Sequence, residues 1–165
     1  MFVVYPDPAL GAAADPSPVD AGLLAVGERL RAAALASQAY GLAAAHIGHV
    51  APVVIMNLAY QGAPRRDLLL YNPRIIAVSA ETESGDEGSV SMPGIEAQVQ
   101  RPIWADVEWQ DETGATQARR FEGFQARVAV NEIEQMQGVF FLNRVSRLKR
   151  DMLIKKFGKL QRKGG

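Results

Sequence analysis

The sequence predicts an α+β fold in a single domain that covers residues 1–165. Its length of 165 residues suits one hydrophobic core. Segments with strand patterning surround one strongly helical segment, residues 124–137, and further helical segments lie near both ends of the chain. No repeat and no low-complexity linker interrupts this pattern, so we expect sheets grouped around a central helix.

The first half of the chain predicts one helix followed by strands. Asp20 is typical of a helix N-cap, and leucines at helical intervals extend the helix to about Ala39. Residues 50–57 form a β-branched apolar run, which predicts a buried strand. Two more strands are expected at residues 67–71 and 74–78, joined by a turn at Asn72-Pro73.

The second half predicts a hairpin and two helices. Residues 103–110 alternate with the strand period, and a turn leads to a strand at 117–122. The helix at residues 124–137 ends at Gly138, a typical C-cap glycine. A last, basic helix is expected at 147–161, with four apolar residues in one stripe that packs on the body: Leu148, Met152, Leu153 and Phe157.

Composition excludes several classes of site. The chain has no cysteine and two histidines, His46 and His49. Disulfides, iron–sulfur clusters, thiolate nucleophiles and multi-histidine metal centres are therefore ruled out. The longest apolar runs, such as residues 52–56, are far shorter than the ~18 residues of a membrane helix. We expect a cytoplasmic protein with no membrane partner.

The net charge of zero hides an asymmetry between the body and the C-terminus. Residues 146–165, a basic helix and tail, contain eight lysine or arginine residues and one acid, so they carry +7 and residues 1–145 carry −7. This pattern is typical of a protein with an anionic partner, although a solvated helix that only covers the core is the alternative.

Three segments, in this order, carry a family resemblance: YGLAAAHIG at residues 40–48, EGSVSMPG at 87–94, and ARVAVNEIEQMQGVFFLNRV at 126–145. They resemble the GxGxAAxQxG, EGCLSxPG and QHExDHLxGxxFxDR motifs of bacterial peptide deformylases, metal hydrolases that remove the formyl group from N-formylmethionine. The resemblance implies antiparallel or mixed sheets around a central helix that carries a degenerate HExxH motif, followed by a C-terminal helix.

The resemblance also implies that the residues at the metal-ligand positions have changed. The family binds Fe2+, Zn2+ or Ni2+ through the cysteine of EGCLS and both histidines of HExxH. Ser89, Asn131 and Gln135 occupy these three positions here. Neutral amides and an alcohol are poor substitutes for imidazole and thiolate, so we expect no bound metal and no other cofactor.

Other positions of the family's site are retained or altered. Glu132 matches the catalytic glutamate, His46 takes the place of the glutamine that polarises the formyl carbonyl, and the Val90 N–H matches its backbone partner. The resemblance implies that Tyr40, Gly41 and Gly88 contact the substrate. Because Ala39 and Tyr40 replace smaller residues, we expect them to narrow the entry of the methionine side chain.

These observations leave three hypotheses about function. The first is a non-catalytic relative, or pseudoenzyme, that binds a nascent N-formylmethionyl peptide or, through its basic C-terminal helix, the ribosome, but not specific DNA. The second is a metal-free acyl-peptide hydrolase that uses Ser89, His46 and Glu132. The third is a deformylase with a weak, unusual metal site formed by His46 and Glu132.

Overall fold

A computed structural model describes residues 1–59 and 61–165 and confirms the α+β fold. All strand pairs are antiparallel, and they form two sheets. The larger sheet has the order β1-β2-β3-β6-β7, with bounds Gly41–Ala43, Val53–Asn57, Asp67–Val78, Trp104–Gln110 and Thr116–Glu122. The smaller one is a hairpin of β4 (Thr82–Gly88) and β5 (Glu96–Pro102).

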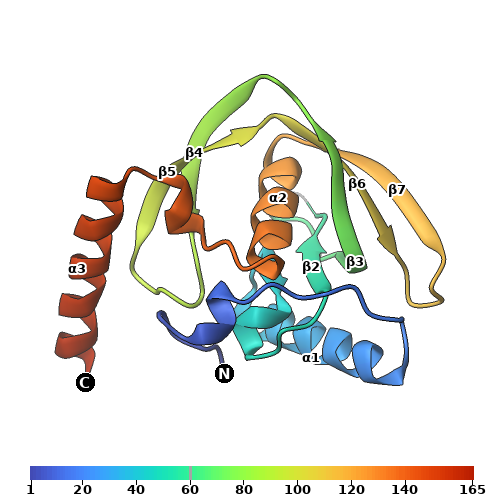
Figure 1. The fold of residues 1–165 in the computed structure, drawn as a ribbon, viewed down its shortest axis with the longest axis horizontal. Helices are drawn as coiled ribbons and strands as arrows, with labels where there is room; N and C mark the ends of the chain where they lie inside the picture. Colours follow the sequence, from blue (N-terminus) through green and yellow to red (C-terminus); the bar gives the residue numbers. More distant parts are fainter. Residues whose placement is uncertain (60) are drawn as a thin grey trace.

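Helix α2 (Phe124–Met136) lies at the centre of the molecule and contacts strands of both sheets (Figure 1). Its apolar residues Ala129 and Ile133 are fully buried in a cluster with Val54, Val107 and Phe121. This packing places α2 beneath the larger sheet and beside the β4–β5 hairpin. It therefore holds residues 131–135 at the meeting point of the two sheets.

The other helices cover the outside. Helix α1 (Ala21–Ser37) packs on β1, β2 and β3, and α3 (Arg147–Gly164) lies at the far side of the hairpin (Figure 1). Three short 3-10 helices complete the structure: Pro8–Gly11, Ala44–Ile47 and Phe141–Arg144. No helix in the described part of the chain has the length and apolar character needed to cross a membrane.

The expected turn at Asn72-Pro73 is instead a bulge inside β3. Register shifts between Tyr71 and Arg74, and Asn72 has a positive φ of 47°. Its side chain accepts a hydrogen bond from the Ser17 backbone N–H at 2.9 Å and donates to Gln110 at 2.7 Å. These bonds hold the left-handed residue, so the strand continues past a dipeptide that normally ends one.

The structure differs from the sequence-based prediction in two further respects. Strands β4 and β5 were not predicted, because the sequence of β4, TESGDEG, has no apolar alternation. Of the four residues expected to form a buried stripe on α3, two are exposed, so the prediction is wrong for these two. Leu153 and Phe157 are buried, but Leu148 and Met152 are 74% and 58% exposed, because only one face of α3 meets the body.

Candidate functional site

A cavity of about 520 Å³ opens between β1, β4 and α2. The structure brings every residue of the predicted site to its wall: Tyr40, Gly41, His46, Gly88, Ser89, Val90, Asn131, Glu132 and Gln135. They come from three separate parts of the chain, residues 40–46, 88–90 and 131–135, and the central position of α2 is what brings them together.

Two strand edges border this cavity. Among the described strands, β1 pairs only with β2, and β4 pairs only with β5. Gly41 and Leu42 of β1 and residues 86–88 of β4 line the cavity. An unpaired edge offers a row of backbone donors and acceptors to an extended peptide.

Gly41 sets the distance between β1 and α2. A Cβ atom at this position would lie 2.6 Å from Val128 Cγ1 and 2.9 Å from Glu132 Cγ. Such contacts are too short, so any larger residue would displace the glutamate or the strand. The glycine therefore allows the strand backbone to lie directly against Glu132.

The three positions equated with metal ligands all have hydrogen-bond partners within the protein. Ser89 Oγ accepts from the Ser91 backbone N–H at 3.1 Å, and Asn131 Oδ1 accepts from Arg101 at 3.4 Å. Gln135 is buried, and its Nε2 donates to the Leu10 carbonyl at 2.7 Å. The Gln135 amide therefore ties α2 to the N-terminal segment.

His46 and Glu132 are both buried, and their Nδ1 and Oε2 atoms are 3.7 Å apart. The His46 Nδ1 accepts the Ala43 backbone N–H at 3.0 Å, so the ring proton of the neutral imidazole is on Nε2. Burial lowers the pKa of His46 to about 4. Burial, with the charge of Glu87, raises the pKa of Glu132 to about 8, and the charge of Arg101 opposes this shift. Both side chains are therefore largely neutral at neutral pH.

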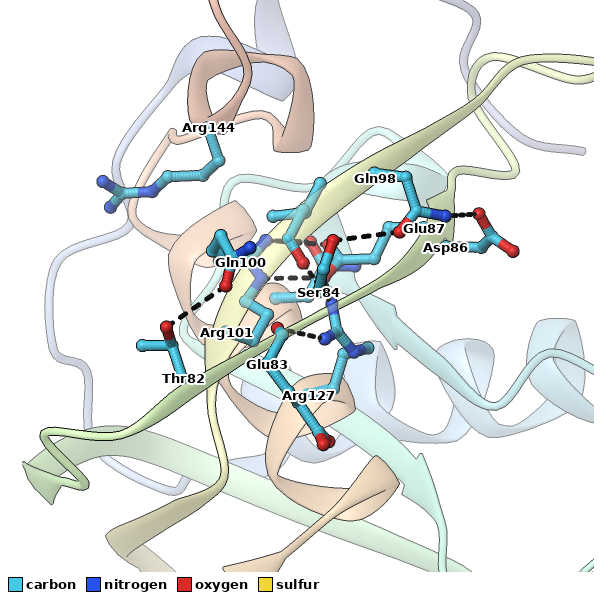
Figure 2. A network of polar contacts seen from close by, with 12 residues as sticks. Thr82, Glu83, Ser84, Asp86, Glu87, Gln98, Gln100, Arg101, Arg127 and Arg144 are labelled. Carbon is cyan, nitrogen blue, oxygen red and sulfur yellow. Dashed lines mark hydrogen bonds and ion pairs between the residues drawn. The ribbon is translucent and has the colours of Figure 1, made fainter.

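A buried ion network lies beside the cavity (Figure 2). Glu87 accepts two hydrogen bonds from Arg101, both at 2.8 Å, and one from Arg127 at 2.8 Å. Arg101 also donates to Glu134 at 2.7 Å. Burial lowers the pKa of Arg101, but its hydrogen bonds to Glu87 and Glu134 and their charges more than offset this, so the pKa is raised.

Arg127 lies at the site although no motif in the sequence predicts it there. The residue is buried, lines the cavity, and also donates to the Val99 and Glu83 carbonyls at 2.8 and 2.9 Å. A Cβ atom on Gly85 would lie 2.8 Å from its guanidinium carbon. The feature of the sequence that could have indicated a buried role for Arg127 is its position as a single cation among the alanines and valines of residues 126–130.

Aromatic rings form the outer rim of the cavity. Tyr40 and Phe124 pack edge to face with ring centroids 5.0 Å apart, and both are about half exposed. Tyr40 therefore lies at the opening of the cavity, and its narrowing of the entry for a methionine side chain stays a prediction.

Comparison with known proteins agrees with this architecture. A family model described as polypeptide deformylase matches residues 1–151. The chain belongs to this family. It is 37% identical over 163 residues to a Brucella suis protein named peptide deformylase-like, covering 98% of each chain. It is also 37% identical over 120 residues to a protein of the same strain named peptide deformylase, covering 73% of this chain and 69% of that protein.

The crystal structure of peptide deformylase from Ehrlichia chaffeensis has the same fold. It matches with a TM-score of 0.91 at 26% identity, covering 99% of this chain and 97% of that one. The scaffold of the deformylase family is thus kept along nearly the whole chain.

The donor set does not fit the metal that the family resemblance implies. Across residues 1–59 and 61–165, no group of three or more His, Cys, Asp or Glu side chains is placed to hold a metal ion. His46 Nδ1 already accepts a backbone N–H, and the Gln135 amide nitrogen is held by Leu10. A transition metal would find one carboxylate and weak neutral oxygens.

The geometry also argues against a catalytic Ser89–His46–Glu132 arrangement. No hydrogen bond joins Ser89 to His46 in the described structure, and Ser89 Oγ is engaged by Ser91. Because Ala43 holds Nδ1 as an acceptor, the remaining ring nitrogen carries the proton and acts as a donor. In this form His46 cannot take a proton from a serine hydroxyl.

Proposed function

We propose that this protein is a non-catalytic member of the deformylase family that binds an extended peptide and does not carry out metal-dependent deformylation. The observation that carries the proposal is the combination of a preserved cavity with altered ligand positions. The cavity still lies between two open strand edges, whereas Ser89, Asn131 and Gln135 are hydrogen-bonded into the protein.

The shape of the site supports a peptide ligand. An extended chain can pair with the edges of β1 and β4 while its first side chain passes the Tyr40–Phe124 rim. The Val90 N–H and the His46 Nε2–H are donors available for a carbonyl oxygen. The same groups bind a carbonyl whether or not a reaction follows.

The absence of reaction follows from the chemistry of water. Without a metal, water has a pKa near 15.7, about nine units above that of a zinc-bound water. Glu132, which is largely protonated at neutral pH, cannot generate hydroxide. The Brucella suis strain contains both a protein named peptide deformylase-like and a protein named peptide deformylase.

The test is formate release from formyl-Met-Ala-Ser by the purified protein, alone and with Fe2+, Ni2+ or Zn2+, beside an active family member. We expect no rate above the buffer blank. Metal-dependent turnover in the usual range of ~1–10³ s⁻¹ would contradict the proposal. Metal-independent release that Ser89→Ala abolishes would support the metal-free hydrolase instead.

We also propose that α3 binds an anionic partner in the cytoplasm, with the ribosome as the candidate. All five lysines of the chain lie in α3, and no cation of this helix forms an ion pair within the described residues. The exposed Leu148 and Met152 add apolar area to this basic surface. Such a site would keep the protein close to nascent peptides.

A further inference from the structure

A second cavity, of about 690 Å³, adjoins the Tyr40–Phe124 rim, and we call it the basic cavity. Its walls come from the end of β2 and the residues after it, from β7 and from the first turn of α2. Tyr40 and Phe124 line both the basic cavity and the central cavity, which lies between β1, β4 and α2. The two cavities therefore meet at these two rings.

The charged side chains of the basic cavity give it a net positive charge. Its lining has three arginines, Arg66, Arg119 and Arg120, and one acid, Glu122. The Asp106 carboxylate accepts two hydrogen bonds from Arg120, at 2.7 and 3.0 Å, so this charge is already paired. Arg66 and Arg119 are exposed and form no ion pair with any residue in the described part of the chain. Two guanidinium groups are therefore available to an anion.

Local contacts hold these two arginines at the cavity wall. The guanidinium carbon of Arg119 lies 5.1 Å from the ring centroid of Phe121, which is fully buried. The backbone N–H of Arg66 donates to Asn57 Oδ1 at 3.0 Å, which holds this residue against the end of β2. A guanidinium group presents paired N–H donors that match the two oxygens of a carboxylate. The basic cavity therefore suits a carboxylate ligand.

The central cavity has the opposite balance of charge. Its lining includes four acids and one cation, Arg127, whose charge is paired with Glu87. A carboxylate of a bound peptide is thus disfavoured inside the central cavity and favoured beyond its rim. A chain that enters the central cavity past Tyr40 and Phe124 leaves its following residues at the basic cavity, because both rings line both cavities.

We propose that the basic cavity binds carboxylate groups of a peptide whose first residue occupies the central cavity, with Arg66 and Arg119 as the binding groups. This inference rests on the proposed peptide-binding function and names its ligand class. The protein then selects peptides that carry carboxylates a few residues after the N-terminus.

The test is calorimetric titration of the whole protein with formyl-Met-Ala-Ser extended by Asp-Asp-Asp, Asn-Asn-Asn or Lys-Lys-Lys and closed by a C-terminal amide. Three residues of extended chain span about 10 Å, so the comparison does not depend on one exact position of the carboxylate. We expect the Asp extension to bind at least about fivefold more tightly than the Asn extension, and the Lys extension to bind more weakly than both. The differences should shrink at about 0.5 M salt, because exposed charges are screened.

A fourth peptide distinguishes the two sources of a carboxylate, the acidic side chain and the end of a short chain. It is the Asn extension with a free C-terminal carboxylate. If it binds as tightly as the Asp extension, one terminal carboxylate is enough for the basic cavity. If it binds like its amide, the acidic side chains are the ligands.

The double variant Arg66→Gln, Arg119→Gln tests the assignment to these two residues. It should lose the preference for the Asp extension and leave the affinity for the Asn extension within about twofold. The matched control is Arg29→Gln, Arg147→Gln, because both arginines are exposed and lie outside the lining of either cavity. The control should keep the preference. The comparison of peptides on the wild-type protein stands even if a variant fails to fold.

The outcomes separate this inference from the proposed function. Equal binding of the Asp and Asn extensions overturns the carboxylate site and leaves peptide binding intact. A folded double variant that keeps the preference overturns the assignment to Arg66 and Arg119. If acetyl-Asp-Asp-Asp-amide alone binds as tightly as the whole Asp-extended peptide, the link between the two cavities is wrong. Failure of every formyl-Met peptide to bind overturns the proposed function itself.

Discussion

At the scale of single residues, Glu132 and His46 lie in one buried pocket, and burial favours the neutral form of each. The pKa of the acid is raised to about 8 and that of the base is lowered to about 4, so the two do not form an ion pair at neutral pH. In the unfolded chain Glu132 ionises near the ordinary glutamate pKa of 4.5. Its ionisation therefore acts against folding over an interval of several pH units.

Glu132→Gln tests this description by its pH dependence. Because the pKa of Glu132 is raised in the folded state, the free energy of unfolding of the wild type falls as the pH rises from about 4.5 to about 8. The isosteric amide of glutamine does not ionise, so the variant shows no such fall. We expect the variant to gain roughly 3–4 kcal/mol over wild type between pH 5 and pH 8. Urea unfolding at both pH values measures the difference. An unchanged difference between the two proteins would contradict the buried, proton-bearing carboxyl.

The residues of the site could be predicted from the sequence where they belong to one of the three motifs. All nine predicted positions line one cavity, because the motif spacing reflects the fold. The partners of these residues were not predictable. Gln135 bonds Leu10, 125 positions away, and Arg127 sits in a space that exists only because Gly85 has no side chain. Such contacts depend on the packed structure and leave no local pattern.

At the scale of elements, the helices were predicted within a few residues and the small sheet was missed. Helix caps are local, and Asp20 and Ser146 both accept backbone N–H groups of the first turn. In β5 the alternation of Ala97, Val99 and Arg101 is real, but the third inward residue is a cation. It is buried only because Glu87 and Glu134 neutralise it.

Helix α3 shows the same limit of prediction from sequence, since the periodicity of apolar residues does not determine which face of a helix is covered by a neighbouring element.

The exposed face of α3 carries the cations that the ribosome proposal needs. We expect wild-type protein to co-sediment with ribosomes at low salt and to be released steeply as salt rises, because each phosphate contact releases counterions. At low salt and at high salt alike, we expect the supernatant to retain the triple variant Lys155→Glu, Lys156→Glu, Lys159→Glu.

A variant with the same change in charge elsewhere provides the control for this experiment. Arg29, Arg66 and Arg119 are exposed and lie outside α3, so their replacement by glutamate should leave most of the binding. Equal pelleting of the wild type and the lysine variant would show that α3 serves only to cover the core.

At the scale of the whole molecule, the scaffold of the deformylase family is kept, and Ser89, Asn131 and Gln135 line the cavity at its centre. The core clusters contain residues of β1, β5 and α2 and none of Ser89, Asn131 and Gln135, and β4 is held by its pairing with β5. Stability here comes from buried apolar area, so changing three polar side chains leaves the backbone geometry intact. The cavity should therefore still accept the original set of ligands.

The triple variant Ser89→Cys, Asn131→His, Gln135→His tests this directly. Positions 131 and 135 are one helical turn apart on α2, so their imidazoles face the same side, where Ser89 also lies. We expect the variant to bind one zinc per chain by elemental analysis, whereas wild type binds none. The double variant without the cysteine, which keeps only two of the three ligands, should bind at least about tenfold more weakly. Loss of the Gln135–Leu10 bond should cost about 1 kcal/mol, which the bound metal more than offsets. A folded triple variant that takes up no zinc at micromolar concentrations would show that the cavity has lost the geometry of the family.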